Sequence, residues 1–320
     1  MSFKSLFKTI LKTSSITSLG ISSLVAFTSP SKAENFNMKA CPEPGSANAT
    51  LAYIQTTLGG ECLHTPDQYK LTIYEMGLCQ TDPISTGVFL KDANGCVQTM
   101  LSTSGTEVDL APGSSSEKTA ALPSASSRPA NGSYPHAYIL LSNGFKMKGS
   151  YQLFDPTGNN NGDTYYSKEA TDAYGTFGAA DKTLSAAAEH TDLVDNMYFG
   201  DDENGWDGVM SATAMPGTGT VSALLLKDCV NDTCVGASAV ASSQGEVKRL
   251  LGVFSNTGSP VEILDSTNGI EVQLIVKADP SNPENSGGGY LLIGWDQGDG
   301  NGFDLRMFGS APFKPKFTTF

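Results

Sequence analysis

Two acidic loops carry the most specific chemical pattern in the sequence. Both read Asp-x-Asn-Gly-aromatic-Asp, and they begin at Asp202 and Asp299. Oxygen-bearing side chains at alternate positions, followed by a glycine for the sharp turn, allow a short loop to direct several ligands at one Ca²⁺ ion. The metal ligands that this pattern predicts are Asp202, Asn204 and Asp207 in the first loop and Asp299, Asn301 and Asp304 in the second.

An ordinary turn is the alternative interpretation of both loops. Aligned on the glycine, the position of the bidentate glutamate of an EF-hand holds Ser211 in the first loop and Phe308 in the second. Asn-Gly is also a frequent hairpin turn that binds nothing. We therefore treat Ca²⁺ as a cofactor that the loops could bind and that the fold does not require.

Aromatic side chains crowd the segment that leads into the first loop and the loop itself, among Asn and Asp residues. Such rings could stack on sugars or pack against a partner subunit, which makes them candidate ligand-binding residues. Packing inside the core of the same segment is the alternative. The aromatic residues concerned are Tyr165, Tyr166, Tyr198, Phe199 and Trp206.

Support for catalysis is thin. The three histidines, His64, His136 and His190, lie far apart in the sequence, and neither a Gly-x-Ser-x-Gly nor a His-Glu-x-x-His motif occurs. The acidic loop 201–207 could supply the carboxylate pair of a secreted hydrolase, but any acidic loop meets that condition. We assign no catalytic residue and expect a protein that is not an enzyme, with the hydrolase as an alternative.

The N-terminal segment reads as a secretory signal peptide, residues 1–33. Lys4, Lys8 and Lys12 precede an apolar run over 16–27, and Ser31-Lys32-Ala33 offers the small residues of a cleavage site. The apolar run is shorter than the roughly 20 residues that a spanning helix needs. We expect a secreted protein of the extracellular space, cell surface or periplasm, with no membrane span after cleavage.

The charge balance restricts the partners. The chain has a formal net charge of −13, and the loss of a lysine-bearing leader makes the mature chain more negative still. Nucleic acid and anionic membranes are poor partners for such a surface. We expect contacts with other copies of the chain, with other surface proteins or with glycans.

Six cysteines remain after cleavage, and an even number in an exported chain favours three disulfides. Zinc is disfavoured because no spacing is Cys-x-x-Cys. We expect the sequential pairing, in which every bond closes a short local loop. The pairs are Cys41 with Cys62, Cys79 with Cys96, and Cys229 with Cys234.

The stretch 128–154 is the strongest structural signal, and it predicts a hairpin. The first arm is apolar on both faces, which is typical of a strand covered twice, whereas the second arm alternates Phe145 and Met147 with Lys146 and Lys148. The Asn-Gly pair at residues 143–144 suits a tight turn between the arms. Alternation elsewhere predicts strands at 68–78, 97–102, 106–111, 220–226, 247–254, 261–264 and 269–277, with a final hairpin formed by 290–295 and 303–308.

Helix signals are few. Residues 49–57 predict a short helix, and 181–196 predict a longer one capped by Asp181. Short strands with Gly, Asn and Pro turns predict an all-β protein, an antiparallel β-sandwich with a long, partly helical insertion and a C-terminal hairpin. At this length, two domains are an equal alternative to one sandwich with an insertion.

A family resemblance gives this fold its boundaries. The resemblance lies in strand residues at 69–78, 108–110, 129–134 and 137–141, and again at 249–254, 260–263 and 272–276. Their order resembles the transthyretin-like (prealbumin-like) surface domain of bacterial lipoproteins, although the lipid-attachment cysteine is missing. It implies a sandwich of 67–154 plus 246–278, with an insertion at 155–245 between its strands. The composition of the remaining chain predicts a disulfide-tethered leader at 34–66 and a C-terminal hairpin and tail at 279–320.

The family implies no chemistry. Our leading expectation is therefore an exported, non-enzymatic structural or adhesive protein. A calcium-dependent carbohydrate- or ligand-binding module is the alternative, with the insertion as its binding face.

Overall fold

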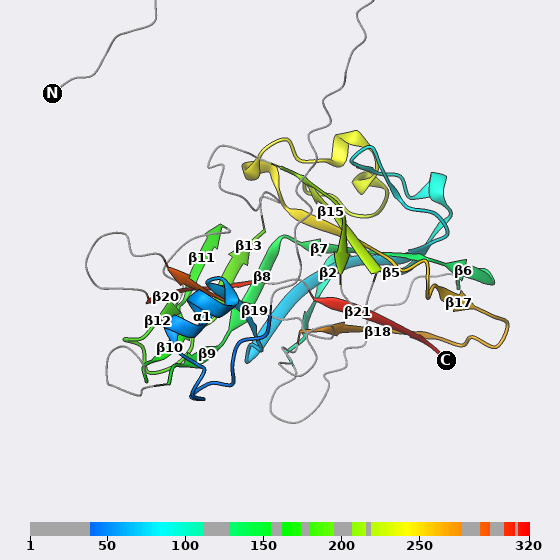
Figure 1. The fold of residues 1–320 in the computed structure, drawn as a ribbon. Coiled ribbons are helices and arrows are strands. Elements are labelled where there is room, and N and C mark those ends of the chain that lie inside the picture. The colour runs from blue at the N-terminus through cyan, green and yellow to red at the C-terminus, as the bar shows by residue number, and fades with distance from the viewer. Residues whose placement is uncertain are drawn as a thin grey trace, which may run out of the picture. The chain divides into compact units, whose positions relative to one another are not determined.

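A computed structural model describes the chain over residues 39–111, 128–154, 162–173, 180–194, 207–215, 219–276, 289–294, 304–310 and 313–320 (Figure 1). These residues all belong to one compact unit. The predicted signal peptide lies outside them. None of the helices in the described ranges is both long and apolar enough to cross a membrane.

One nine-stranded sheet dominates the fold, and it confirms the all-β prediction. Its order is β11-β13-β8-β2-β7-β16-β15-β14, and β5 pairs with the other edge of β2. All pairs are antiparallel except β11 with β13. The strands are β2 (Gln68–Cys79), β5 (Cys96–Asp109), β7 (His136–Ser142), β8 (Gly144–Lys148), β11 (Ala170–Ala173), β13 (His190–Leu193), β14 (Val209–Met215), β15 (Gly219–Leu226) and β16 (Arg249–Ser255).

Four of these strands, β11, β13, β14 and β15, come from the segment that the sequence predicts as an insertion. They extend the main sheet at both of its ends. The two-layer sandwich stays a prediction.

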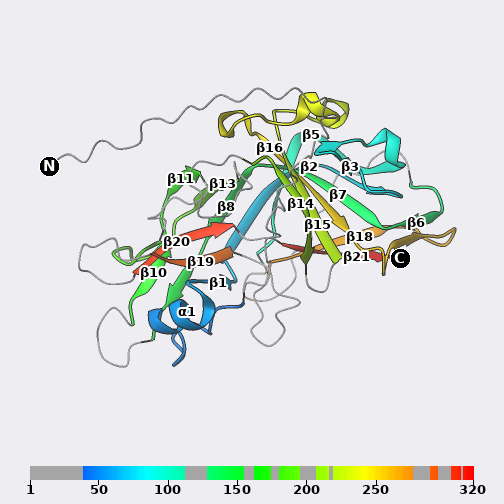
Figure 2. The same cartoon turned by 45° about the horizontal axis from the view of Figure 1, so that its top comes forward.

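The predicted hairpin at residues 143–144 is wrong. β7 and β8 do not pair with each other, because both lie on the same edge of β2, one after the other. The sheet instead branches at Asn143, whose backbone N–H donates to Lys248 O at 3.3 Å while its carbonyl accepts from Val194 N at 2.8 Å. On one side of this branch point β7 pairs with β16, and on the other side β8 pairs with β13. Figure 2 shows the two groups of strands diverging.

The branch has a physical cause. β2 is twelve residues long, so one extended partner can cover its whole edge, and both predicted arms offer apolar residues to the same core. Neither Asn143 nor Gly144 adopts a positive φ, which a two-residue hairpin turn requires. Pairing of both arms with β2 therefore forms in place of the hairpin that the local turn sequence favours.

Alternate residues of β7 enter two different cores, as the pattern of its arm predicts. Ile139 and Leu141 lie in the first core, together with Tyr69, Leu71 and Ile73 of β2. Tyr138 and Leu140 lie in the second core, which also contains Leu224, Leu251 and Val253 of β15 and β16. The sheet is therefore covered on both faces along β7.

Smaller sheets surround the main one, and they confirm the C-terminal hairpin. β19 (Gly289–Gly294) pairs with β20 (Asp304–Ser310) and with β1 (Glu61–His64). The tail forms β21 (Lys314–Thr319), which pairs with β18 (Ile270–Ile275). The remaining strands are β3 (Ile84–Ser85) with β4 (Val88–Phe89), β6 (Gly132–Tyr134) with β17 (Val261–Ile263), and β10 (Thr164–Ser167) between β9 (Ser150–Gln152) and β12 (Ala180–Asp181).

One predicted helix is confirmed and the other is wrong. Helix α1 (Leu51–Leu58) begins where the Thr50 side chain accepts the N–H of Tyr53, and it ends at Gly59 with φ of 85°. No helix occupies the described part of 181–196. Asp181 caps a turn by accepting the Thr183 N–H at 2.7 Å, and the chain then forms β13 against β8. Four short 3₁₀ turns complete the description: η1 (Asp92–Asn94), η2 (Asn231–Cys234), η3 (Ala237–Ala239) and η4 (Gln244–Glu246).

The three disulfides pair the cysteines sequentially, as predicted. Cys41–Cys62 joins the start of the described chain to β1, within the predicted leader and next to a bridge between Ala40 and Leu63. Cys79–Cys96 links the end of β2 to the start of β5, where the two residues are direct cross-strand neighbours. Cys229–Cys234 closes the loop that follows β15.

Candidate functional site

Most of the predicted metal ligands fall outside the described residues. This holds for Asp202, Asn204, Asp299 and Asn301. Asp207 is described, and its Oδ1 accepts the N–H of Val209 at 2.8 Å; Asp304 begins β20, where its backbone pairs with Gly294. Within the described ranges, no three or more His, Cys, Asp or Glu side chains come together as a metal site would require. Calcium binding by the two loops stays a prediction.

The predicted ligand-binding aromatics divide in the same way. Trp206, Tyr198 and Phe199 lie outside the described residues. Tyr165 is fully buried in the first core, which corrects its assignment as a ring available to a ligand, whereas its neighbour Tyr166 is half-buried. The reason is that consecutive residues of β10 face opposite sides of its small sheet.

The histidines serve packing rather than a shared centre. His64 lies edge-on to Tyr151, and one ring nitrogen contacts the Ser150 carbonyl oxygen at 3.0 Å. Burial lowers the pKa of His64 to about 4, so the ring is neutral at ordinary pH. His136 lies on β7 and shares a hydrogen bond of 2.7 Å with the Ser255 hydroxyl of β16.

A buried polar cluster beside the second core brings an amine, an amide and a carboxyl group together. Glu75 and Lys91 are buried, with side chains only 2% and 8% exposed, and Lys91 Nζ lies 3.0 Å from Glu75 Oε1. We call this group the Glu75–Lys91 cluster; its other members are Gln98, Tyr138 and Asn231, with Asp232 at its rim. Its members come from three strands and two loops, so the fold alone brings them together.

A β-bulge in β2 directs Glu75 into the cluster. The register of β2 shifts between Ile73 and Glu75 against both neighbouring strands. Ile73 and Met76 therefore face the first core, while Glu75 turns toward Tyr138 in the second. Re-aiming a side chain in this way is a common use of a bulge.

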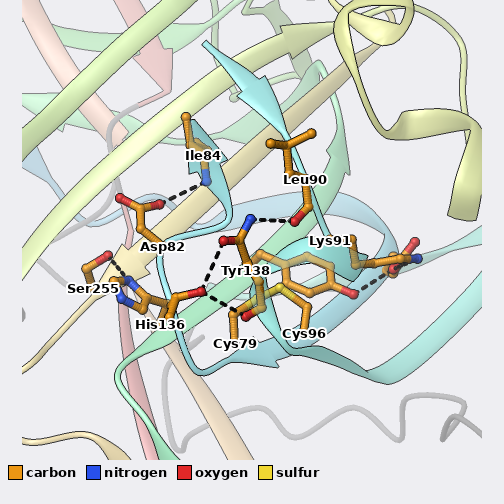
Figure 3. Close-up of a disulfide and its surroundings, with 12 residues drawn as sticks. Cys79, Asp82, Ile84, Leu90, Lys91, Cys96, His136, Tyr138 and Ser255 are labelled. Atoms are coloured by element: carbon orange, nitrogen blue, oxygen red, sulfur yellow. Dashed lines mark hydrogen bonds and ion pairs between the residues drawn. A yellow bond between two sulfur atoms is a disulfide. The ribbon is translucent and has the colours of Figure 1, made fainter. Parts of the chain in front are cut away.

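The Tyr138 ring lies across the next part of β2. Gly77 is its direct cross-strand neighbour, and a Cβ at Gly77 would lie 2.3 Å from the ring. The missing side chain thus leaves room for the ring, whose hydroxyl donates to Glu75 Oε1 at 2.6 Å. Figure 3 shows the ring beside the Cys79–Cys96 disulfide, with its hydroxyl directed toward Lys91. Burial, followed by the charge of Glu75, raises the pKa of Tyr138 well above its usual range, so the hydroxyl remains a donor.

The Cys229–Cys234 loop brings an amide to the ammonium group. Asn231 adopts φ of 56°, and its Oδ1 lies 3.1 Å from Lys91 Nζ. Gln98 Nε2 donates to the same oxygen, also at 3.1 Å. Asp232 Oδ1 lies 3.2 Å from Lys91 Nζ, but its side chain is 77% exposed.

The arrangement has a defined chemical capacity. It holds an amine, a primary amide and a carboxyl group within hydrogen-bonding distance, with two further donors, Tyr138 and Gln98, aimed at the carboxyl and amide oxygens. The sequence patterns do not reveal this site. The one local signal is a glutamate in the apolar and aromatic second half of β2, and that signal does not identify the partners of Glu75.

Comparison with protein-family models, with curated proteins and with solved structures found no match to this chain.

Proposed function

We propose that the chain is an exported, non-enzymatic structural or adhesive protein of the cell surface or extracellular space. The observation that carries the proposal is the placement of the three disulfides. Each bond ties a peripheral segment to a strand or closes the loop at a strand end, and disulfides persist in oxidising compartments. The signal-like N-terminus and the acidic surface agree with such a location.

The buried polar side chains support a structural role. Asp192 of β13 accepts hydrogen bonds from the Ser310 N–H and hydroxyl of β20, which joins the main sheet to the β19–β20 hairpin. Glu75 of β2 is bonded to Lys91 in the segment that follows β4. In both cases a buried carboxylate connects segments of the chain to each other, as expected for a protein that must keep its shape outside the cell.

Two measurements test the proposal. Fractionation of cells that make the full chain should place the mature protein in the medium or at the surface, accessible to added protease. Light scattering after size exclusion of oxidised residues 34–320, in Ca²⁺ and again in chelator, should then show a defined oligomer or polymer. Retention inside the cell would contradict export. A monomer in both buffers would contradict a self-assembling subunit and leave binding to a surface glycan or protein as the function to test.

A further inference from the structure

The Glu75–Lys91 cluster has the composition of a self-acting cross-linking site. We propose that the side chains of Lys91 and Asn231 become joined by an isopeptide bond, with Glu75 as the catalytic proton carrier. This inference goes beyond the proposed function, and it does not depend on where the protein resides.

Proximity is the first requirement, and the fold meets it. Lys91 Nζ lies 3.1 Å from Asn231 Oδ1 and 3.0 Å from Glu75 Oε1. Holding reacting groups at such distances removes much of the entropic barrier to a reaction that is very slow between free amines and amides in water. The two reacting side chains are separated by 140 residues in the sequence, so only the folded chain provides this proximity.

Exclusion of water is the second requirement. The Glu75 and Lys91 side chains are almost fully buried, next to Tyr138 of the second core. Because the carboxylate lies 3.0 Å from the ammonium with almost no water around the pair, the proton can pass directly from Lys91 Nζ to Glu75 Oε1. The product of that transfer is an amine with a free lone pair, which is the form that can attack a carbonyl carbon.

The reaction is an acyl transfer that balances without any added reagent. After a proton passes from Lys91 Nζ to Glu75 Oε1, the amine lone pair attacks Asn231 Cγ and the Nζ–Cγ bond forms. Glu75 delivers its proton to Asn231 Nδ2 and takes one from Nζ, the Cγ–Nδ2 bond breaks, and ammonia leaves. The sum is a primary amide plus an amine giving a secondary amide plus ammonia, with no change of oxidation state.

The remaining members of the cluster have positions that assist this step. Gln98 Nε2 donates to Asn231 Oδ1, where negative charge develops during the attack. The Tyr138 hydroxyl donates to Glu75 Oε1 and so fixes the orientation of the carboxyl group. Gln98 thus stabilises the transition state, and Tyr138 is a positioning residue.

Asn231 is a better acyl donor than Asp232, although both contact Lys91. The Asp232 side chain is 77% exposed, so its carboxylate stays hydrated, and a hydrated carboxylate resists attack by an amine. The Asn231 amide is neutral, and its oxygen is already polarised by Gln98. The structure therefore assigns Asn231 as the partner of Lys91.

The test is the intact mass of the full exported chain, reduced and denatured after purification in its folded, three-disulfide form. We expect a mass lower than that of the linear mature chain by one ammonia. Tandem mass spectrometry of a proteolytic digest should then give one branched peptide that contains both Lys91 and Asn231. On a reducing gel the cross-linked chain should migrate faster than a linear variant, because its unfolded form retains a closed loop.

Three variants make the result specific. Lys91→Arg keeps the positive charge and Glu75→Gln keeps a hydrogen-bond acceptor, and both should show the full linear mass while forming the same disulfides. Asp232→Asn should retain the ammonia loss. A folded wild-type protein with the unchanged linear mass would overturn the proposal. So would an ammonia loss that persists in Lys91→Arg, because that would identify a cyclic imide at an asparagine instead of a cross-link.

Discussion

Two sets of ion pairs lie along strand β2, one beside its start and one past its bulge, and they differ in burial. Near its start, Lys70 pairs with Glu189 at 3.2 Å, and Lys146 of the adjacent β8 pairs with Glu107 at 2.6 Å. These four side chains are between 28% and 43% exposed. Beyond the bulge, Glu75 pairs with Lys91 in a site that is nearly closed to water.

The comparison shows that one strand can use the same pair of residue types for two purposes. Exposed pairs are screened by solvent and contribute little to stability, on the order of 0–1 kcal/mol. A buried pair carries a desolvation cost that an apolar pair would avoid, so its presence points to a task other than stability alone. Only one shifted register separates the two environments on β2.

Removal of the buried cation should produce the largest effect. Relative to Lys91→Arg, which keeps the positive charge and forms no cross-link, Lys91→Met leaves Glu75 buried without its counter-charge, and we expect the free energy of unfolding to fall by about 3–5 kcal/mol. Denaturant titration followed by circular dichroism measures the change. Combining Lys91→Met with Glu75→Leu should recover the share due to the unpaired carboxylate. A loss below about 1 kcal/mol for the single variant would show that the buried pair contributes no more to stability than the exposed pairs do.

A methyl group at Gly77 should disturb the buried end of β2 by a smaller amount. Gly77→Ala places a Cβ 2.3 Å from the Tyr138 ring, so the ring must move away from Glu75. We expect a loss of about 1–3 kcal/mol by thermal or denaturant unfolding, as for other overpacked sites. Gly252→Ala on β16 is the matched control, because its nearest contact would be an ordinary 3.5 Å to Ile139. Equal losses in both variants would show that the Tyr138 position is not specifically restricted.

Removal of the exposed cation should have little effect. Lys146→Ala breaks the ion pair with Glu107, and we expect a change of less than about 1 kcal/mol that disappears in high salt. The measurement is the same denaturant titration at low and high ionic strength. A salt-independent loss of several kcal/mol would mean that the start of β2 is as dry as its end.

The smallest expected effect is a pH dependence of the exposed pairs. The hydrogen bond from the Gln68 amide, and then Lys70, lowers the pKa of Glu189 below its ordinary 4.5. A lowered pKa in the folded state gives stability that is present above 4.5 and is lost as the pH falls through the folded-state value. The difference in unfolding free energy between the wild type and Glu189→Gln should therefore shrink between neutral and acidic pH. A difference that grows on acidification would contradict this sign.

Much of the fold could be predicted from local patterns. Several correct predictions depend on neighbours in the sequence: the strands at 68–78 and 220–226, the double burial of 137–141, the short helix at 49–57 and the sequential cysteine pairing. The errors arose where distant partners decided the outcome. The Asn-Gly pair at 143–144 predicts a hairpin, but both arms pair with the twelve-residue β2 instead. The periodicity after Asp181 predicts a helix, but part of that segment pairs with β8 as β13.

The candidate site could not be predicted for the same reason. The direction of the Glu75 side chain depends on a bulge that the sequence of β2 does not predict. The contact between Asn231 and Lys91 depends on a loop that lies 140 residues further along the chain. The two Asp-x-Asn-Gly-aromatic-Asp loops, by contrast, were recognisable as motifs, but most of their predicted ligands lie outside the described residues. Pattern and spacing identify a site whose residues are adjacent in sequence far more readily than one assembled by the sheet.

The strand order also governs when the protein can finish folding during its synthesis. β7 needs β16 as its neighbour, and a ribosome adds only about 5–20 residues per second, so all of 143–248 must be made before that partner exists. For several seconds an apolar strand with an unpaired edge would be available to other chains, which is a hazard for aggregation. A delivery route that keeps the chain unfolded until translation ends avoids this interval, so the topology favours late folding over folding during synthesis.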